Sequence, residues 1–473
     1  MEKIRHNCGL CVAHTLHDVY GFITDLQHRG REATGIAAVG DGDITVIKWV
    51  GPVNTFDLKD LGKIFPDTRY HTFLAHVRYA TRGRKDQLLL DAHPHVIGGE
   101  TIDRGSHVII RGCEMAIVHN GQVDIGRYFP EVELPNLKTG CDTEKLLWIY
   151  KEKGIREILK KIPNSYTLAI ADRNAKGVIV ARDRMGVRPG VIGLMHGKHC
   201  MASEDIVFRK LRRDDGEVLE NITPGYIFYL LPDGGSSKEE VVEKEKRHCF
   251  FEVNYIGDVD SVLFNLPVRV VRGKLGERLA IEFSSLADIV TYLPRCPEVA
   301  AMEYAKKTGL PFEPVFYKMR GERSFQGPDS VERAISISNN LHLLPGVEKI
   351  IKDKSVVVVD DSIIRGNNSK RAIKLLKEAG VAKIYFLSYT PPMCIRGKDG
   401  VLRGCSKGVD MPISPPVGEE YIARDRTMEE ISEIMGAEVG YLSVEGMLDV
   451  FKKHGLPADN LCYFCLGGPN IDK

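Results

Sequence analysis

A run near position 360 has the residue types that bind a sugar phosphate. Four consecutive valines at 356–359 precede Asp360 and Asp361, a short loop of Ser, Gly and Asn residues, and a helical pattern at 370–379. Backbone N–H groups in such a loop can cradle a phosphate, and ionised carboxylates accept hydrogen bonds from ribose hydroxyls. Because α/β folds bind ligands at the carboxyl ends of buried parallel strands, the run predicts a ribose 5-phosphate site. An ordinary strand-to-helix turn with acidic residues is the alternative.

A second set of reactive residue types lies in the first third of the chain. Cys8 is a candidate nucleophile, and an N-terminal cysteine would supply its own base through an α-amino group with a pKa of about 8. Asn120 and Gly121 could offer a side-chain and a backbone N–H to an oxyanion. Arg78 and Asp142 suit the α-carboxylate and α-ammonium of an amino acid. Taken singly, such a cysteine is more often a core residue, and an Asn-Gly pair is usually a turn.

The cysteines indicate thiol or metal chemistry. Eleven cysteines, an odd number, in a long chain without a signal peptide argue against a disulfide framework. Cys462 and Cys465 form a C-x-x-C pair, which in a four-cysteine set suits zinc or an iron–sulfur cluster, and spacing leaves both open. Cys8 and Cys11 form another such pair, in which Cys11 is expected in the core. The other thiols are expected to be small buried residues, at positions 113, 141, 200, 296 and 394.

Composition limits the class of protein. A length of 473 residues predicts two to four domains, and 43% hydrophobic with 27% charged residues is ordinary for a globular chain. A net charge of +1 gives no electrostatic reason to expect nucleic acid or an anionic membrane as a partner. No run of eighteen apolar residues occurs, and the first residues lack a hydrophobic signal core. The sequence therefore predicts a soluble cytoplasmic protein.

The elements that would position these residues fall into two patterns. The first half alternates short β-rich runs, at 35–39, 167–171, 177–181 and 226–231, with helical stretches at 15–29 and 142–161. A Pro/Gly/Ser stretch at 232–237 and a charged run at 238–247 form the best linker candidate.

After the linker candidate, helices and strands alternate. Helices are expected at 271–284, 369–379, 427–435 and 444–453, and strands at 287–292, 355–360 and 383–388. This alternation predicts a doubly wound parallel sheet.

In their order along the chain, the two sets of residues resemble known families. The set from Cys8 to Asp142 resembles the class II glutamine amidotransferases, whose N-terminal-nucleophile domain is an αββα sandwich of the α+β class. The run 356–369 resembles the phosphoribosyl pyrophosphate (PRPP) motif of the type I phosphoribosyltransferases, which are α/β proteins. Over nearly all of residues 8–470 the chain therefore resembles the glutamine PRPP amidotransferase family of purine synthesis. Further matching stretches are 183–189, 249–252, 260–262, 278–280 and 439–446.

The resemblance implies a division of the chain. It implies a propeptide at 1–7, a glutaminase domain at 8–240, a phosphoribosyltransferase domain at 245–440 and a C-terminal helical segment at 441–473 that carries cluster cysteines.

The resemblance also implies residue roles. Cys8 would attack glutamine, Asn120 and Gly121 would hold the oxyanion, and the glutamine would be positioned by Arg29, Arg78, Thr81 and Asp142. Ammonia would displace pyrophosphate from carbon 1 of PRPP, giving 5-phosphoribosylamine. The PRPP site would comprise Asp360, Asp361, Ser362, Arg365, Gly366, Asn367, Asn368 and Ser369, with Lys318, Arg320 and Arg323 on a loop that closes over pyrophosphate.

Cofactors and partners follow from the same resemblance. A [4Fe–4S] cluster would be held by Cys249, Cys405, Cys462 and Cys465, and Mg²⁺ would bind near Asp360 and Asp361. Glutamine and PRPP are the expected substrates, purine nucleotides the expected inhibitors, and a homotetramer or homodimer the expected assembly. Neither nucleic acid nor a membrane is an expected partner.

Some stretches depart from the family pattern around the expected PRPP site. Asn367-Asn368 replaces the usual Thr-Thr, the loop at 318–325 is a residue short and carries Glu322, the segment 292–297 lacks the usual Pro-Asp-Ser-Gly turn, and an extra piece occupies 396–403. Three alternatives stay open: a paralogue with another phosphoribosyl donor or acceptor, a non-catalytic iron–sulfur or nucleotide-binding regulator, and a different class II amidotransferase. The run 356–369 argues against the last, because those reactions need no PRPP loop.

Overall fold

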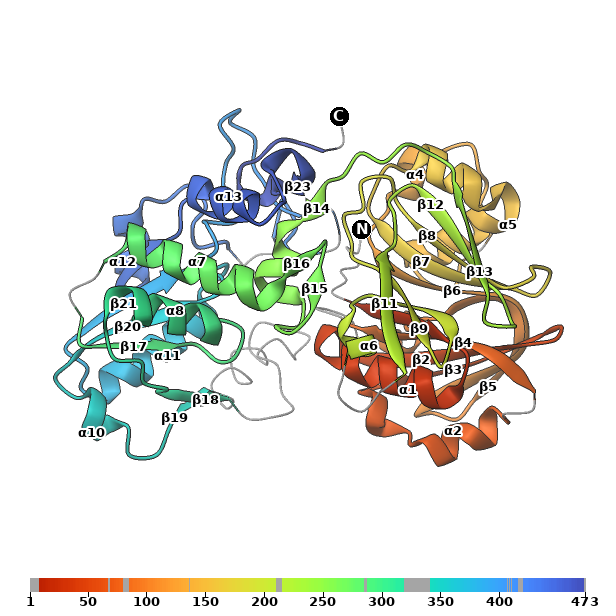
Figure 1. Cartoon of the computed structure of the whole chain (residues 1–473), viewed down its shortest axis with the longest axis horizontal. Helices are drawn as coiled ribbons and strands as arrows, with labels where there is room; N and C mark the ends of the chain where they lie inside the picture. Colours follow the sequence, from red (N-terminus) through yellow and green to blue (C-terminus); the bar gives the residue numbers. More distant parts are fainter. Residues whose placement is uncertain are drawn as a thin grey trace.

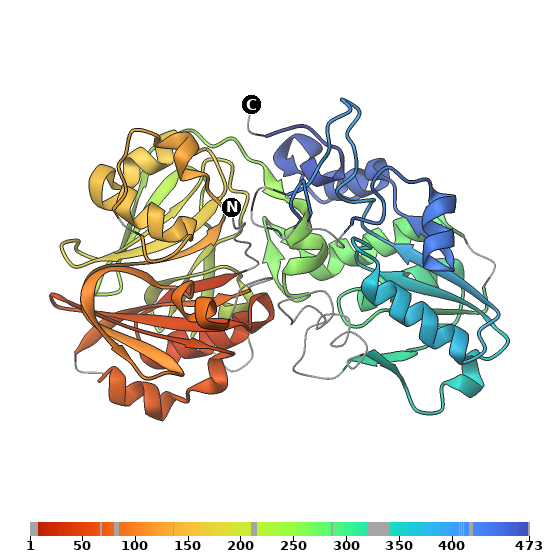
Figure 2. The ribbon, with the colours of Figure 1, turned by 180° about the vertical axis from the view of Figure 1, so that it is seen from behind.

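The two halves of the chain form two lobes that lie side by side. The structure, a computed structural model, describes residues 8–66, 69–79, 85–135, 137–209, 215–284, 287–318, 341–405, 407, 409, 411–415 and 420–471. Figure 1 shows the first half, from red to yellow-green, in one lobe and the second half, from green to blue, in the other. Figure 2 shows the same arrangement from behind.

The first lobe is built on an antiparallel ladder of strands. Its strands are β1 (Gly9–Ala13), β2 (Ala33–Gly40), β3 (Asp43–Val50), β4 (Tyr70–Arg78), β5 (His95–Asp103), β6 (His107–Gly121), β7 (Tyr166–Asp172), β8 (Val178–Arg182), β9 (Val191–Met195), β10 (Lys198–Ala202), β11 (Gly216–Asn221), β12 (Tyr226–Leu230) and β13 (Ser236–Glu240). They pair in the order β11-β9-β10-β1-β4-β2-β3-β6-β7-β8-β12-β13, with β5 also on β6. The long β6 pairs with β3 through its first residues and with β7 through its last, so it connects the two layers.

Side-chain alternation separates this lobe into four layers. On β1, Leu10 and Val12 enter a core between two sheet layers, whereas Cys11 and Ala13 face an outer core. Helices α1 (Leu16–Asp25), α2 (Leu58–Ile64) and α6 (Ile206–Arg209) contribute to that outer core, and α4 (Ile125–Tyr128) and α5 (Asp142–Lys161) to one on the opposite side. The lobe is therefore the predicted αββα sandwich, and Cys11 is a core residue as expected.

The second lobe contains a parallel sheet covered on both faces. Strands β17 (Ile289–Tyr292), β20 (Ser355–Asp360), β21 (Lys383–Ser388) and β22 (Glu438–Tyr441) lie in that order and are all parallel. One face carries α7 (Val268–Glu282), α8 (Glu298–Thr308) and α13 (Val444–Lys453), and the other carries α10 (Glu348–Ile351), α11 (Asn367–Glu378) and α12 (Met428–Met435). This is the predicted doubly wound arrangement.

The four valines of β20 explain why this strand lies inside the sheet. Val357 and Val359 enter the core under α7, and Val356 and Val358 enter the core under α11. Each is fully buried, which contributes about 1.5–3 kcal/mol per side chain relative to an exposed position. The strand therefore holds Asp360 and the loop after it at the carboxyl edge of the sheet.

Pairs of short strands add to the second lobe. They are β14 (His248–Cys249) paired with β23 (Leu461–Cys462), β15 (Val262–Leu263) with β16 (Leu266–Pro267), and β18 (Phe316–Lys318) with β19 (Leu341–Leu343). The remaining helix of the first lobe is α3 (Lys85–Leu90).

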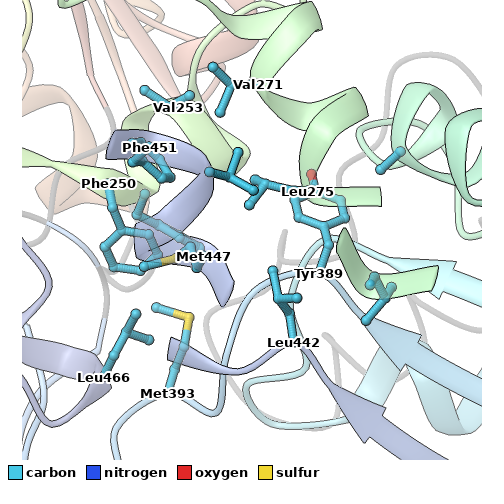
Figure 3. Close-up of a cluster of buried hydrophobic side chains, with 14 of the residues drawn as sticks. Phe250, Val253, Val271, Leu275, Tyr389, Met393, Leu442, Met447, Phe451 and Leu466 are labelled. Carbon is cyan, nitrogen blue, oxygen red and sulfur yellow. The ribbon is translucent and has the colours of Figure 1, made fainter. Parts of the chain in front are cut away.

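The core beneath α7 extends beyond its own lobe. Figure 3 shows Phe250, Val271, Leu275, Met447 and Phe451 converging in it. Met185 and Val187 of the first lobe belong to the same cluster. The lobes are thus joined by apolar packing as well as by the chain.

The predicted helices and strands are confirmed, but the linker is shorter than expected. Ser236–Glu240 forms β13 instead of a linker, and Leu231 N–H donates to Gly235 O within the hairpin turn. Lys238 stabilises this edge strand, because its ammonium pairs with Glu220 at 2.7 Å and lies over the Phe228 ring. None of the helices within the described ranges is long and apolar enough to cross a membrane.

Candidate active sites

Cys8 lies directly before the central strand β1 and is buried. Its neighbour Gly9 pairs with Val77, so the thiol lies beside the carboxyl end of β4 and Tyr79. Burial raises the pKa of the Cys8 thiol to about 11, although the Tyr79 N–H and the charge of Arg78 act in the opposite direction. A base is therefore required to generate the thiolate nucleophile near neutral pH.

Arg29 connects Cys8 to a buried ionic network. Its Nε donates to the Cys8 carbonyl at 2.8 Å, Nη1 donates to Glu204 Oε1 at 2.5 Å, and Nη2 donates to Glu252 Oε2 at 2.9 Å. Burial would raise the pKa of Glu204, but His28 and Arg29 outweigh it and hold that pKa well below its ordinary value. Arg29 therefore supports the Cys8 backbone from a fixed position.

The predicted oxyanion residues lie at the end of β6. One amide hydrogen of Asn120 donates to Ser203 Oγ at 2.9 Å, and that hydroxyl also accepts the Leu10 N–H. An amide nitrogen carries two hydrogens, so the second can serve an oxyanion. Gly121 has φ of 145°, and a Cβ at this position would lie 1.9 Å from Ser165 O. Only glycine fits there, and the assignment of both residues to an oxyanion stays a prediction.

The residues predicted to bind the two ends of glutamine have other partners in the structure. Arg78 ends β4, and its Nη2 pairs with Asp91 Oδ2 at 3.2 Å. Asp142 is the first residue of α5, and its Oδ2 accepts the Val123 N–H at 2.8 Å. Both charges act on the intervening Cys141. Thr81 lies outside the described residues.

The acidic pair of the predicted PRPP site lies at the end of β20. Asp361 N–H donates to Asp360 Oδ1 at 2.9 Å, and Ser362 Oγ donates to Asp361 Oδ1 at 2.7 Å. Burial and the adjacent carboxylate raise the pKa of Asp360 well above its ordinary value, and burial raises that of Asp361 to about 6. Two buried carboxylates side by side favour a bound cation, and the oxygen donors fit Mg²⁺.

The loop after the acidic pair leads into a helix N-terminus. Gly366 adopts φ of 75° directly before α11, whose first residues are Asn367, Asn368 and Ser369. N–H groups at a helix start are orphan donors that bind phosphate. Arg365 lies over the Tyr421 ring, with its guanidinium carbon 5.5 Å from the ring centre.

One cavity of about 730 Å³ joins the two sets of residues. Arg29 and Tyr79, which interact with Cys8, contribute to its wall. Asp361 and Gly366 line the same cavity, as does Lys318 at the end of β18. Arg320 and Arg323 lie outside the described residues. The structure thus connects the neighbourhood of the nucleophile to the carboxyl edge of the parallel sheet.

Cysteines gather where β14 meets β23. Cys249 lies opposite Cys462 in this pairing. Burial and the sulfurs of Cys405, Cys394, Cys462 and Cys249 raise the pKa of Cys465 well above its ordinary value. A site that concentrates buried thiols suits a metal group, which holds them as thiolates. The four predicted ligands fit an iron–sulfur cluster in this respect.

The extra piece at 396–403 was expected around the PRPP site, and this was wrong. Among the described residues, none from this piece lines the cavity. Its Arg396 pairs with Asp425, and Arg403 lies over the ring of Phe464, between Cys462 and Cys465. The Arg403 guanidinium also pairs with Asp399 at 2.8 Å. By contrast, the altered segment at 293–296 and both asparagines do line the cavity.

Several residues of the sites were missed from the sequence. Cys394 was expected to be an ordinary buried residue, yet it lies close enough to Cys405 and Cys465 to interact with them. Glu252 accepts from both Arg29 and Arg188, the latter at 2.6 Å. Arg188 and Glu252 lie in stretches that match the family, but their pairing depends on contacts between distant segments. No local signal in the sequence predicts it.

Comparisons with known proteins agree with this geometry. The glutamine amidotransferase domain family matches residues 112–227. A chloroplastic amidophosphoribosyltransferase of Glycine max is 30% identical over 462 residues, covering 94% of this chain and 74% of that protein. The amidophosphoribosyltransferase of Bacillus subtilis is 29% identical, covering 95% and 90%. The solved glutamine PRPP amidotransferase from B. subtilis, complexed with ADP and GMP, has a TM-score of 0.78 at 26% identity, covering 98% and 97%.

The fold and the shared cavity define a class: a glutaminase of the N-terminal-nucleophile kind joined to a phosphoribosyltransferase-like lobe. The similarity extends over both lobes and not over one domain alone. This chain belongs to the amidophosphoribosyltransferase family.

Proposed function

We propose that this enzyme transfers the amide nitrogen of glutamine to carbon 1 of PRPP, giving 5-phosphoribosylamine, pyrophosphate and glutamate. The observation that carries this proposal is the cavity lined both by residues holding Cys8 and by the acidic pair with its phosphate-type loop. The family membership of the whole chain supports it.

The first half-reaction uses the Cys8 region. The Cys8 sulfur would attack the side-chain carbonyl carbon of glutamine, forming a thioester as ammonia leaves, and water would then release glutamate. Because burial raises the pKa of the thiol to about 11, proton removal needs a nearby base. The α-amino group of Cys8, exposed by removal of residues 1–7, is the base we propose. Asn120 and Gly121 would stabilise the oxyanion, while Arg29, Arg78, Thr81 and Asp142 would position glutamine.

The second half-reaction uses the carboxyl edge of the parallel sheet. Ammonia would cross the cavity without meeting bulk water and form a bond to carbon 1 as the bond to pyrophosphate breaks. The N-terminus of α11 would hold the 5-phosphate, and Asp360 and Asp361 would face the ribose hydroxyls. Lys318, Arg320 and Arg323 would bind pyrophosphate, with Arg365 and Ser362 completing the site.

Two inorganic groups fit this assignment. Mg²⁺ near Asp360 and Asp361 would neutralise charge on the leaving pyrophosphate. A [4Fe–4S] cluster held by Cys249, Cys405, Cys462 and Cys465 would cross-link β14, β23 and the loop at 405, stabilising the native state by binding only to it.

The family also suggests how the enzyme is regulated and assembled. The B. subtilis relative was solved with ADP and GMP, so purine nucleotides are the inhibitors we propose. We expect a cytoplasmic homodimer or homotetramer. Light scattering would measure the mass of the assembly and so its number of subunits.

The test is glutamate release from glutamine by anaerobically purified protein, with and without PRPP and Mg²⁺. Strong stimulation by PRPP is expected, because both substrates would act through one cavity. Glutamate release at the same rate with and without PRPP would favour a paralogue with another acceptor. It would direct attention to Asn367 and Asn368. No release from protein whose first residue is Cys8 would contradict the proposal.

A further inference from the structure

Three potential metal ligands converge in the first lobe, beside the start of α5. His93, His95 and Cys141 each offer one ligand atom, and these atoms all lie within 4.8 Å of one another. Their exposed fractions are 1%, 4% and 0%. They come from the segment entering β5 and from the residue preceding α5, so the tertiary structure alone brings them together. None of them belongs to the thiol group at β14 and β23.

His95 has the arrangement of a metal-binding imidazole. Its ring hydrogen-bonds to the backbone of Asp91 through one nitrogen, while Nε2 has no hydrogen-bond partner within the described part of the chain. Metal-bound histidines commonly donate their second ring nitrogen to a backbone carbonyl, which fixes the ring and leaves the other lone pair for the metal. A buried, unpartnered imidazole nitrogen is otherwise costly.

His93 and Cys141 complete the group. Cys141 Sγ lies 3.9 Å from His93 Nε2, and His93 Nδ1 accepts the His119 N–H at 3.3 Å. Metal binding at Nε2 requires the remaining ring proton to be on Nδ1, so this long hydrogen bond would be lost in exchange for a metal–nitrogen bond. The Cys141 thiol would release its proton on binding.

The surrounding charges suit a dication. Asp91, Asp142 and Glu144 lie close enough to act on Lys48 or on Cys141, as does Arg78. Three carboxylates face two cations in this region, which leaves net negative charge for a divalent ion to neutralise, although both cations, Lys48 and Arg78, also act on His95.

We propose that His93, His95 and Cys141 form a mononuclear site for a divalent transition metal of the zinc type. Two imidazoles and one thiolate suit zinc in a tetrahedral set, with the fourth position taken by water. Cys141 is the residue before α5, whose first residue is Asp142. Metal binding would therefore fix the start of α5 and the carboxylate that we assign to glutamine.

Zinc binding by the full-length protein tests this site. Protein purified anaerobically is treated with a chelator, desalted and titrated with Zn²⁺ against a chromophoric competitor, and zinc and iron are then counted by mass spectrometry. The variants are Cys141→Ser and His95→Phe. The control is Cys113→Ser, since Cys113 is also buried in this lobe and burial also raises its thiol pKa to about 12.

Wild type and Cys113→Ser are expected to bind about one zinc per chain more tightly than the competitor, and Cys141→Ser and His95→Phe at least tenfold more weakly. Iron content should be the same in all four proteins. Co²⁺ added to wild type should give a thiolate-to-cobalt charge-transfer band that Cys141→Ser lacks.

Equal zinc affinity in all four proteins, or no tight zinc in wild type, would overturn the proposal. If Cys141→Ser does not fold, His95→Phe and the cobalt spectrum of wild type decide the matter. Neither measurement needs turnover, so failure here is distinct from failure of the amidotransferase proposal.

Discussion

Arg29 and Glu252 form a buried ion pair between the lobes, with Nη2 and Oε2 at 2.9 Å. Because Nε of the same guanidinium donates to the Cys8 carbonyl, Cys8 is connected to the second lobe through Arg29. Glu252 also accepts from Arg188, whose charge interacts with Cys249 and Cys405. A continuous chain of polar contacts thus runs from the Cys8 carbonyl to the thiol group.

Replacing Arg29 should destabilise the protein and uncouple the lobes. Arg29→Met leaves Glu204 and Glu252 without this cation, and breaking a buried pair by removing one partner costs about 3–5 kcal/mol. The urea midpoint should fall, and PRPP should stimulate glutamate release less. Arg269→Gln breaks the half-exposed pair with Asp260 and should change stability by about 1 kcal/mol or less. Equal midpoints for the two variants would contradict the role of the buried pair.

Cys8→Ala should abolish glutamine use and retain ammonia-dependent PRPP turnover. The substitution leaves the acidic pair and the loop before α11 unchanged. Cys11→Ala removes the neighbouring core thiol and should keep both activities. Pyrophosphate release, measured with glutamine and then with ammonium chloride, distinguishes them. Loss of both activities in Cys8→Ala would mean that the two sites do not work separately.

Asp361 should make the cation-free protein less stable as pH rises. Burial raises its pKa to about 6, and an acid with a raised folded-state pKa favours folding while protonated. That contribution is present below about pH 4 and is lost as the pH rises through about 6. Asp361→Asn should therefore raise Tm more at about pH 7.5 than at about pH 4.5 in calorimetry without divalent cations, while PRPP turnover is lost.

The control for Asp361 is Asp353→Asn, which replaces an exposed carboxylate near the start of the same strand. If Asp361→Asn changes Tm equally at both pH values, ionisation of the buried Asp361 does not destabilise the folded state.

Cys462→Ser should give colourless, less soluble protein with little iron, because β23 presents this thiol to the proposed cluster. Cys394→Ser is the matched control, since it removes a thiol from the same place that is not among the four assigned ligands. It should keep its colour. Visible absorption and iron content measure both variants, and a brown Cys462→Ser with full iron would refute the ligand assignment.

Gly121→Ala should inactivate the glutaminase. The added Cβ would lie 1.9 Å from Ser165 O, at a φ of 145° that alanine avoids. Gly126→Ala, at a position whose nearest neighbour would be 3.7 Å away, should be tolerated. Glutamate release by the folded fraction of each variant, isolated by gel filtration, compares them; an active Gly121→Ala enzyme would remove this residue from the oxyanion assignment.

The sequence by itself determined what depends on local pattern. The apolar run at 167–171, which forms β7, and the valines of β20 specify their strands, because burial on both faces leaves no other placement for such runs. The acidic pair and the Gly-containing loop follow β20 directly, so the order of residues alone places them at the carboxyl edge of the sheet.

Only the tertiary structure decided which distant residues meet. The pairing of Arg29 with Glu252, the approach of Cys394 to Cys465 and the convergence of His93, His95 and Cys141 join segments far apart in the chain. No periodicity or spacing encodes such contacts. They arise when whole layers and lobes pack together, because that packing decides which side chains from distant segments come into contact.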